Sequence, residues 1–315
     1  MKIPPCLNHS LSTADREEIA NGQLLNRDFA SFCSTLPVSL TVNGRKRSVS
    51  EIFIGWAWYS VRHFAIICEM IAIIPAAGHG TRFLPVTRVV PKEMLPIGSK
   101  PALELIVEEA KSAGASEIVL VISHGKELVR AYFQDDPAVR FVYQEEQKGL
   151  GHAVLMAAER AREAADSVLI LLGDALIAGC NASREMVALS GENGGAAVIG
   201  CERVPPEKVS RYGILKLADG RVVDMVEKPS VDEAPSDIAV AGRYLLPTTV
   251  FEYLKTQTPG KGGEIQLTDA IRRMIAPEGT ERPLTLLPYV YPGRRQDIGN
   301  PHGYFEALKA MGANG

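Results

Sequence analysis

Short apolar strands that alternate with helices predict a doubly wound α/β fold for most of this chain. Three runs have the length of strands, at residues 71–75, 117–123 and 167–174. They are continuous rather than alternating, as expected for parallel strands covered on both faces. The predicted architecture is therefore a three-layer, Rossmann-like α/β/α fold with a mixed, mostly parallel sheet.

The segments between these strands carry helix signals. Residues 101–115 place apolar side chains at helical spacing, with Pro101 near the first turn and Gly114 as the stop. Residues 151–165 are rich in helix-forming residues and precede the third strand. Strand–helix–strand connections of this kind are right-handed, and ligands bind at the carboxyl ends of the strands. We therefore expect the functional site at that edge of the sheet.

The second half of the chain adds hairpin and helix signals. Residues 212–229 predict two strands around Asp219 and Gly220, a pair suited to the positive φ angles of a tight turn. Residues 238–246 predict a further strand. A helix is expected at residues 267–276, where Thr268 can act as the N-cap and Asp269 lies near the positive end. Its apolar face consists of Leu267, Ile271, Met274 and Ile275.

Composition narrows the classes of function. The chain has 315 residues, 46% hydrophobic and 23% charged, which is enough for one large core or two modest ones. Its formal charge of -3 provides no global field to hold nucleic acid or an anionic membrane. The five cysteines form no C-x-x-C pair, which favours free thiols over a disulfide framework or a zinc site. We expect a cytoplasmic protein without nucleic-acid or membrane partners.

Residues 1–69 differ in sequence pattern from residues 70–315. They show little sustained periodicity, and their most apolar run, residues 52–61, is far shorter than the ~20 residues of a membrane helix. The first residues, MKIPPC, do not form a signal peptide. A buried strand then begins sharply at Met70. We interpret residues 1–69 as an extension of uncertain role, either a small docking segment or a stretch that the functional protein does not need.

The stretch AAGHGTRFLPVTRVVPKEMLP directly follows the first strand. Its small residues Ala76, Ala77, Gly78 and Gly80 let the backbone approach a ligand, and successive N–H groups can form an anion-binding concavity. The stretch lacks the Walker pattern. A dinucleotide fingerprint would need a glycine where Phe83 stands, which disfavours a nicotinamide-dependent dehydrogenase. A Gly-x-Gly alone is weak, since a plain tight turn also explains it.

The longer run, G-x-G-T-R-x-L-P followed by P-K-E-M-L-P, resembles the sugar-1-phosphate nucleotidyltransferases, and most closely the bacterial-type UTP-glucose-1-phosphate uridylyltransferases. The resemblance continues in order through QEEQKGLGHAV, LGD, RYGIL, VEKP, AGRYLL, GEIQLTDAI and QDIGNPHGYFEA, from about Met70 to Met311. It implies the nucleotide-diphospho-sugar transferase fold. It also implies in-line attack of glucose 1-phosphate on the α-phosphorus of UTP, which yields UDP-glucose and pyrophosphate.

This reaction brings two polyanions together, so it depends on cations and oriented donors. The resemblance assigns Arg82 and Lys92 to the pyrophosphate side. An arginine offers a planar fork to phosphate oxygens, and a lysine offers a point charge. Lys228 matches the family position that bridges the sugar phosphate and the α-phosphate. Most arginines and lysines are simply solvated, and Arg88 is interpreted as such a surface charge.

The resemblance also assigns the substrate-binding residues. Gln144 and Gly149 match the positions that read uracil, where an amide can both donate and accept. Without the K-G-L-G run that follows it, Gln144 would be read as an exposed residue at a strand end. Gly213 and Glu227 match the positions that bind the sugar hydroxyls. His152 is expected to pack near a helix start rather than to act in catalysis.

Two aspartates match the metal ligands of the family. Asp174 ends the third strand, and Asp297 lies in the QDIGNP motif. Hard carboxylate oxygens suit Mg²⁺, which is often shared between one or two carboxylates and substrate phosphates. The alternatives are a helix-capping role for Asp174 and a turn role for Asp297.

Three readings of function follow. The first is a Mg²⁺-dependent UTP-glucose-1-phosphate uridylyltransferase, which the resemblance implies to be a homo-oligomer. The second keeps the reaction but uses another base, as in glucose-1-phosphate thymidylyl- or cytidylyltransferases. The third is a non-catalytic sugar-nucleotide sensor on the same fold. Retention of Arg82, Lys92 and Lys228 argues against the sensor, since a sensor has no need of cations for a leaving group.

Overall fold

The computed structural model describes residues 39–42, 45–48, 70–276 and 283–311. The chain divides into two compact units, Met1–Ile67 and Cys68–Gly315. In the first unit, β1 (Ser39–Val42) and β2 (Arg45–Ser48) pair antiparallel. The apolar run at residues 52–61 lies outside the described residues. All further description concerns the second unit.

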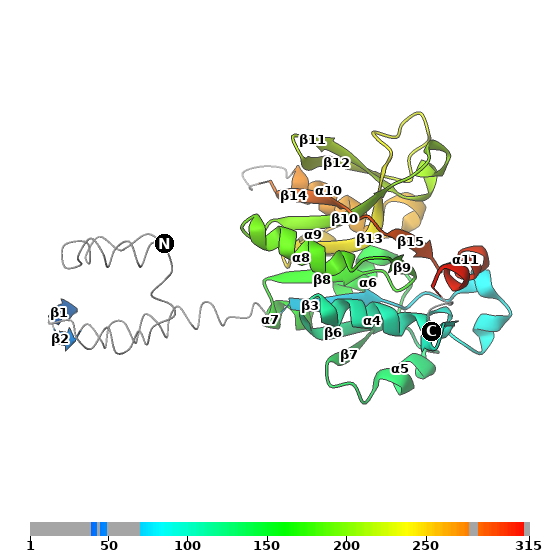
Figure 1. The fold of residues 1–315 in the computed structure, drawn as a ribbon, viewed down its shortest axis with the longest axis horizontal. Coiled ribbons are helices and arrows are strands. Elements are labelled where there is room, and N and C mark those ends of the chain that lie inside the picture. Colours follow the sequence, from blue (N-terminus) through cyan, green and yellow to red (C-terminus); the bar gives the residue numbers. More distant parts are fainter. Residues whose placement is uncertain (1–38, 43–44, 49–69, 277–282, 312–315) are drawn as a thin grey trace. The chain divides into compact units, whose positions relative to one another are not determined.

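The second unit is built on a nine-stranded sheet (Figure 1). Along the main path the strands are β12 (Arg221–Glu227), β11 (Gly213–Ala218), β13 (Ile238–Pro247), β8 (Ser167–Leu171), β3 (Met70–Pro75), β6 (Ala115–Ile122) and β7 (Val139–Tyr143). Two further strands, β10 (Ala197–Arg203) and β14 (Leu286–Val290), extend it through β13. The three strands predicted from apolar runs are confirmed as β3, β6 and β8.

The sheet is mixed, as predicted. Strands β8, β3, β6 and β7 are parallel to one another. The other half contains antiparallel pairs, namely β13 with β8, β10 with β13, β11 with β12 and β11 with β13. The predicted turn between β11 and β12 is confirmed, since Asp219 and Gly220 have φ angles of 49° and 73°.

Helices cover both faces of the sheet, which confirms the three layers. Alternate residues of β3 enter separate cores, with Ile71 and Ile73 on one face and Ala72 and Ile74 on the other. The first core includes residues of α6 (Leu150–Met156), α7 (Ala158–Ala164), α9 (Val250–Lys255) and α10 (Leu267–Ile275). The second includes residues of α4 (Ala102–Ser112), α5 (Glu127–Phe133), α8 (Ala182–Glu192) and α11 (Pro301–Met311).

One predicted helix is divided in the structure. The helical stretch predicted at residues 151–165 is present as two helices, α6 and α7, which meet at Ala157, whose φ and ψ are −86° and 0°. The N–H of Ala157 bonds the carbonyl of Val154, three residues back, so this turn is tightened. Ala157 is fully buried in the core. Packing around it decides where the first helix ends, which local helix propensity does not specify.

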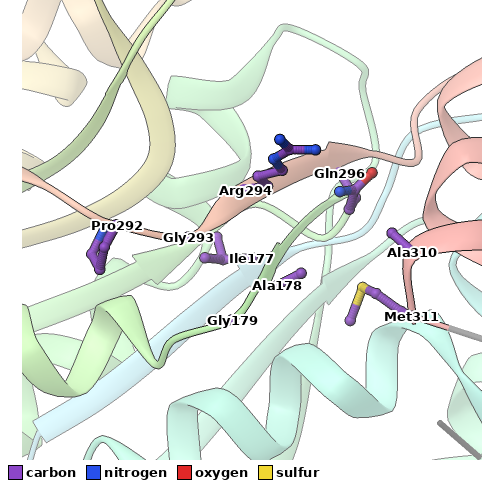
Figure 2. A pocket seen from close by; sticks show the side chains of 9 residues that line it. All are labelled: Ile177, Ala178, Gly179, Pro292, Gly293, Arg294, Gln296, Ala310 and Met311. Atoms are coloured by element: carbon purple, nitrogen blue, oxygen red, sulfur yellow. The ribbon is translucent and has the colours of Figure 1, made fainter.

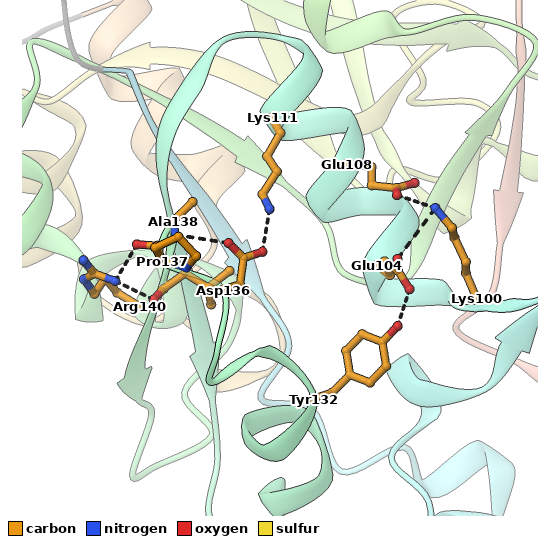
Figure 3. A network of polar contacts seen from close by, with 10 residues as sticks. Lys100, Glu104, Glu108, Lys111, Tyr132, Asp136, Pro137, Ala138 and Arg140 are labelled. Atoms are coloured by element: carbon orange, nitrogen blue, oxygen red, sulfur yellow. Dashed lines mark hydrogen bonds and ion pairs between the residues drawn. The ribbon is translucent and has the colours of Figure 1, made fainter.

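Ion pairs fix the exposed side of α4 (Figure 3). Lys100 pairs with Glu104 and Glu108, and the Tyr132 hydroxyl of α5 donates to Glu104. Lys111 binds Asp136 before β7. Each such surface contact contributes at most ~1 kcal/mol. Within the described part of the chain, the helices are too short or too polar to cross a membrane.

Candidate functional site

The predicted nucleotide loop leaves the carboxyl end of β3. The Ala76 N–H donates to the Val121 carbonyl at 2.8 Å, so the loop starts as a continuation of the sheet. Gly80 has φ of +66°, and a Cβ there would lie 2.9 Å from the Thr87 side chain. The Thr87 hydroxyl donates to the Gly80 carbonyl at 2.9 Å. The glycine therefore allows the chain to fold back toward η5 (Lys92–Met94).

A cavity of about 270 Å³ lies beside this loop. Seven of the predicted site residues line it: Ala76, Ala77, Gly78, Lys92, Gln144, Gly149 and Asp174. They come from the carboxyl ends of β3, β7 and β8, from η5 and from the start of α6. The remaining predicted residues, Gly80, Arg82, Gly213, Glu227, Lys228 and Asp297, are not part of the cavity lining.

Gln144 is held in a defined orientation at the end of β7. Its side-chain amide nitrogen donates to the Gly149 carbonyl at 3.2 Å and lies 3.0 Å from Nδ1 of His152. Burial lowers the pKa of His152, with Lys148 adding to the effect, so its neutral ring can accept this hydrogen bond at Nδ1. His152 lies in α6 and orients Gln144, a contact that the sequence did not reveal.

Gly149 occupies a position that requires glycine. Its φ and ψ are 95° and −179°, a region used almost only by glycine. A Cβ there would lie 2.7 Å from Cβ of Glu264 and 3.0 Å from the carbonyl of Ile265. The loop 148–151 is also tied to that segment, because the Ile265 N–H donates to the Lys148 carbonyl at 2.7 Å.

Alternating charges extend from the cavity lining, where Asp174, Lys92 and Glu93 lie, to Lys126, which is not part of the lining. Nζ of Lys92 donates to Oδ2 of Asp174 at 2.7 Å and lies 4.0 Å from Glu93, whose other oxygen accepts from Lys126 at 2.5 Å. Burial would lower the pKa of Lys92, but Asp174 and Glu93 outweigh it and raise that pKa. Burial would raise the pKa of Asp174, but Lys92 and Arg82 hold it below its usual value. Both groups are therefore charged at neutral pH.

The two predicted metal ligands converge. A Cβ at Gly299 would lie 2.9 Å from Oδ2 of Asp174 and 3.0 Å from Oδ1 of Asp297. The Ile298 N–H donates to the Asp174 carbonyl, and the Gly299 N–H donates to Asp297. Within the residues described by the structure, no group of three or more His, Cys, Asp or Glu could hold a metal ion. Two carboxylates that face the same space fit a Mg²⁺ whose other ligands are waters and phosphates.

The predicted sugar-binding residues gather where β11 and β12 pair. Gly213 lies opposite Glu227 in the register, and Glu227 accepts a hydrogen bond from the Thr268 hydroxyl at 2.8 Å. The prediction that Thr268 caps a helix is wrong. Helix α10 begins at Leu267 after Gln266. Thr268 lies inside the helix, where its hydroxyl is used by a tertiary partner rather than by the helix end.

Lys228 directly follows β12 in an unusual conformation. Its φ is +46°, and its N–H donates to the Tyr212 carbonyl at 3.0 Å. Its ammonium lies 3.6 Å from Glu227. Left-handed backbone is uncommon for a residue with a long side chain and occurs where the surrounding structure imposes it. The pairing of Tyr212 with Lys228 is such a constraint.

Two further polar residues line the cavity without having been assigned to the site from the sequence. Glu93 is buried beside Lys92, and the Gln147 amide donates to the Ala77 carbonyl at 3.2 Å. Glu93 stands in the P-K-E-M-L-P motif, which was the available signal. Arg82 is exposed, and Arg88 is exposed as predicted.

A larger hollow, about 700 Å³, lies elsewhere and contains none of the predicted site residues (Figure 2). It is bounded by β9 (Ala175–Ala178), by β15 (Arg294–Asp297) and by the end of α11. Arg294 is its only charged lining residue within the described chain. Size alone therefore does not mark the site, because the convergent charged and glycine residues surround the smaller cavity.

This arrangement, a glycine-rich loop after a parallel strand beside convergent charges, is typical of proteins that bind nucleotides. A family model described as nucleotidyl transferase matches residues 71–314, and the chain belongs to this family. Within it, the chain is similar to UTP-glucose-1-phosphate uridylyltransferase YngB of Bacillus subtilis, with 38% identity over 272 residues. That alignment covers 76% of this chain and 89% of YngB. The Pseudomonas aeruginosa uridylyltransferase is 36% identical, with 75% and 93% covered.

Solved structures show the same likeness. A UDP-glucose pyrophosphorylase complexed with UDP-glucose superimposes with a TM-score of 0.70 at 34% identity, covering 78% of this chain and 99% of that one. The UTP-bound UDP-glucose pyrophosphorylase from Acinetobacter baumannii superimposes with a TM-score of 0.66 at 31% identity. The superposition covers 78% of this chain and 96% of that one. A thymidylyltransferase described as putative, from Bacillus anthracis, shares the fold at 22% identity.

Proposed function

We propose that this protein transfers the uridylyl group of UTP to glucose 1-phosphate, forming UDP-glucose and pyrophosphate. The supporting observation is its identity of 36–38% to several UTP-glucose-1-phosphate uridylyltransferases across most of their length. The cavity adds chemical support, since a glycine-rich loop, an oriented amide, a lysine and an aspartate line one space.

The reaction forms one bond and breaks one. A phosphate oxygen of glucose 1-phosphate bonds to the α-phosphorus of UTP, and the bond from that phosphorus to the oxygen bridging to the β-phosphate breaks. Pyrophosphate leaves with the electron pair. The nucleophile is already anionic, so we expect neither a general base nor a covalent intermediate. Catalysis then depends on placing the two anions and offsetting their charge.

We assign the nucleotide to the cavity. Gln144, oriented by His152, reads the uracil edge, and Gly149 gives the base access to the backbone. The N–H groups of residues 77–80, beyond the Ala76 N–H that is bonded within the sheet, face the phosphates. Lys92 and Arg82 take the charge that develops on pyrophosphate, and Arg82 acts from the exposed end of the loop.

We assign glucose 1-phosphate to the residues around β11 and β12. Glu227, oriented by Thr268, accepts from sugar hydroxyls, and Gly213 presents its backbone beside it. Lys228 bridges the sugar phosphate and the α-phosphate. Asp174 and Asp297 would hold Mg²⁺, which when bound supplies positive charge to the α-phosphate and helps align it for attack.

A single assay tests the proposal. Purified protein is incubated with Mg²⁺, glucose 1-phosphate and each nucleoside triphosphate in turn, and pyrophosphate release is measured. We expect release with UTP. A preference for dTTP would replace the proposal with a thymidylyltransferase, although one methyl group in the pocket changes binding by only about 1–3 kcal/mol. No release with any nucleotide would support a sugar-nucleotide sensor.

We also propose a homo-oligomer located in the cytoplasm, with the extension at residues 1–69 dispensable. The family resemblance supports a homo-oligomer. The phosphorylated substrates, together with the free thiols of Cys180 and Cys201, support a cytoplasmic location. Light scattering would give the oligomeric state. A protein beginning at Met70 should keep full turnover and thermal stability, and loss of either would assign the extension a role.

A further inference from the structure

Arg295 lies on β15, two residues before Asp297, and its side chain is only 10% exposed. Its guanidinium forms an ion pair with Glu202 of β10 at 2.7 Å. It also lies over the Tyr212 ring, 4.1 Å from the ring centroid. The Tyr291 hydroxyl donates to the other oxygen of Glu202 at 3.2 Å. One cation thus joins segments that are far apart in the sequence.

Tyr212 connects this cation to the sugar-binding residues. It immediately precedes Gly213, and its carbonyl accepts the N–H of Lys228, whose φ is +46°. A ring held against a guanidinium fixes the backbone at Tyr212, and that backbone in turn holds Lys228 in its left-handed conformation. The stack of the Arg295 guanidinium on the Tyr212 ring therefore influences the position of Lys228, the cation proposed to bind the sugar phosphate.

Strand β15 connects the same cation to the proposed metal ligands. Arg295 and Asp297 are two residues apart, so their side chains project from the same face of the strand. Asp297 lies opposite Ala175 in the β9–β15 pairing, beside Asp174. Arg295 is therefore anchored to the strand that carries one ligand while its side chain holds Tyr212.

We propose that Arg295 is a positioning residue that sets the spacing between the metal aspartates and the residues binding glucose 1-phosphate. The inference rests on the proposed function. It assigns Arg295 to the sugar-phosphate side of the reaction, although Arg295 is remote in sequence from Gly213 and Lys228. A merely structural ion pair would affect folding without distinguishing one substrate from the other.

The test compares variants that keep or remove the stack. Tyr212→Phe keeps the ring face, whereas Tyr212→Leu removes it. Arg295→Lys keeps the charge beside Glu202 but loses the planar group, and Arg295→Met loses both. For Tyr212→Leu and Arg295→Met we expect the KM for glucose 1-phosphate to rise about tenfold, with the KM for UTP changing less than about twofold. For Arg295→Lys, the KM for glucose 1-phosphate should lie between that of the wild type and that of Arg295→Met. For Tyr212→Phe, it should match the wild type.

Arg273→Met is the matched control, because Arg273 lies over the Tyr253 ring, 5.3 Å from its centroid, and no site residue is assigned to that pair. It should change neither KM. Thermal unfolding of each variant separates folding defects from kinetic ones. If the KM values for both substrates rose equally, or if Tyr212→Leu kept wild-type kinetics, the inference would be overturned while the proposed function would stand. No turnover by the wild-type protein would overturn the proposed function and the inference together.

Discussion

The proposed nucleotide and sugar halves of the site are built in different ways. On the nucleotide side, Ala76 and Gln144 directly follow the parallel strands β3 and β7, and Asp174 lies three residues after β8, immediately before β9. On the sugar side, residues come from an antiparallel hairpin, from a helix and from a separate ribbon. The hairpin β11–β12 and strand β7 form opposite ends of the main strand order (Figure 1).

The difference shows when a sequence motif is sufficient to locate a site. Parallel strands bring their carboxyl ends to one edge, so a polar residue after a buried strand is placed by the fold class alone. Antiparallel strands alternate in direction, so their site residues depend on register and on which helix packs nearby. Thr268 illustrates this dependence, since its hydroxyl donates to Glu227, on a different element.

The largest expected effect comes from breaking the buried charge pair on the nucleotide side. Glu93→Gln leaves Lys126, which is buried, without a carboxylate. We expect the free energy of unfolding to fall by about 3–5 kcal/mol, as measured by denaturant titration. The double variant Glu93→Gln/Lys126→Met removes both charges and should recover most of this loss. If Glu93→Gln were as stable as the wild type, Glu93 and Lys126 would not form a stabilising buried pair.

Loss of the aspartate shared by both halves should mainly affect catalysis. Asp174→Asn keeps the side-chain shape but weakens the proposed metal site and the ion pair with Lys92. We expect kcat to fall about 10²- to 10³-fold, measured as pyrophosphate release at saturating substrates. Asp232→Asn, at an exposed aspartate, is the matched control and should be neutral. Wild-type turnover in Asp174→Asn would remove this residue from the mechanism.

Gly149→Ala tests the nucleotide side selectively. The added Cβ would collide with Glu264 and Ile265, and the φ of +95° itself costs of order 1–3 kcal/mol. We expect the KM for UTP to rise about tenfold, with a smaller change for glucose 1-phosphate. Gly191→Ala is the control, since no atom beyond the backbone of its own helix and its chain neighbours lies within 4 Å of a Cβ there. Equal effects on both substrates would mean that the two halves are not separable.

Thr268→Val tests the sugar side selectively and should have a smaller effect. The substitution keeps the shape but removes the hydroxyl that orients Glu227. One such hydrogen bond contributes about 0.5–1.5 kcal/mol, so we expect the KM for glucose 1-phosphate to rise about threefold to tenfold. The KM for UTP should stay unchanged. An unchanged KM for glucose 1-phosphate would exclude Thr268 from sugar binding.

An ion pair between α4 and β13 predicts an effect that is confined to low pH. Burial would raise the pKa of Glu109, but Arg243 holds it below the usual 4.5. Its stabilising contribution is therefore complete above that usual value and is lost as pH falls through the lower folded pKa. Denaturant titrations at several pH values should show stability declining below about pH 4.5. In Glu109→Gln, this acid-dependent part of the decline should be absent.

Three strands of the parallel half and one antiparallel hairpin were predictable from the sequence, because their signals are local. Continuous apolar runs predicted β3, β6 and β8, and the Asp219–Gly220 turn predicted the β11–β12 hairpin, each within a few residues. The contacts of the site were less predictable. Lys126 pairs with Glu93 across two elements, and His152 orients Gln144 although it was expected only to pack.

The sequence by itself determined the strands β3, β6, β8 and β13, the β11–β12 hairpin with its turn, and the residue types that the chemistry needs, because backbone preference and hydrophobic periodicity act over a few neighbouring residues. Only the tertiary structure decided that Asp297 lies beside Asp174, that Thr268 holds Glu227 rather than capping a helix, and that Arg295 lies over Tyr212. These contacts join residues far apart in the chain, so they depend on strand pairing and packing, which local preferences do not specify.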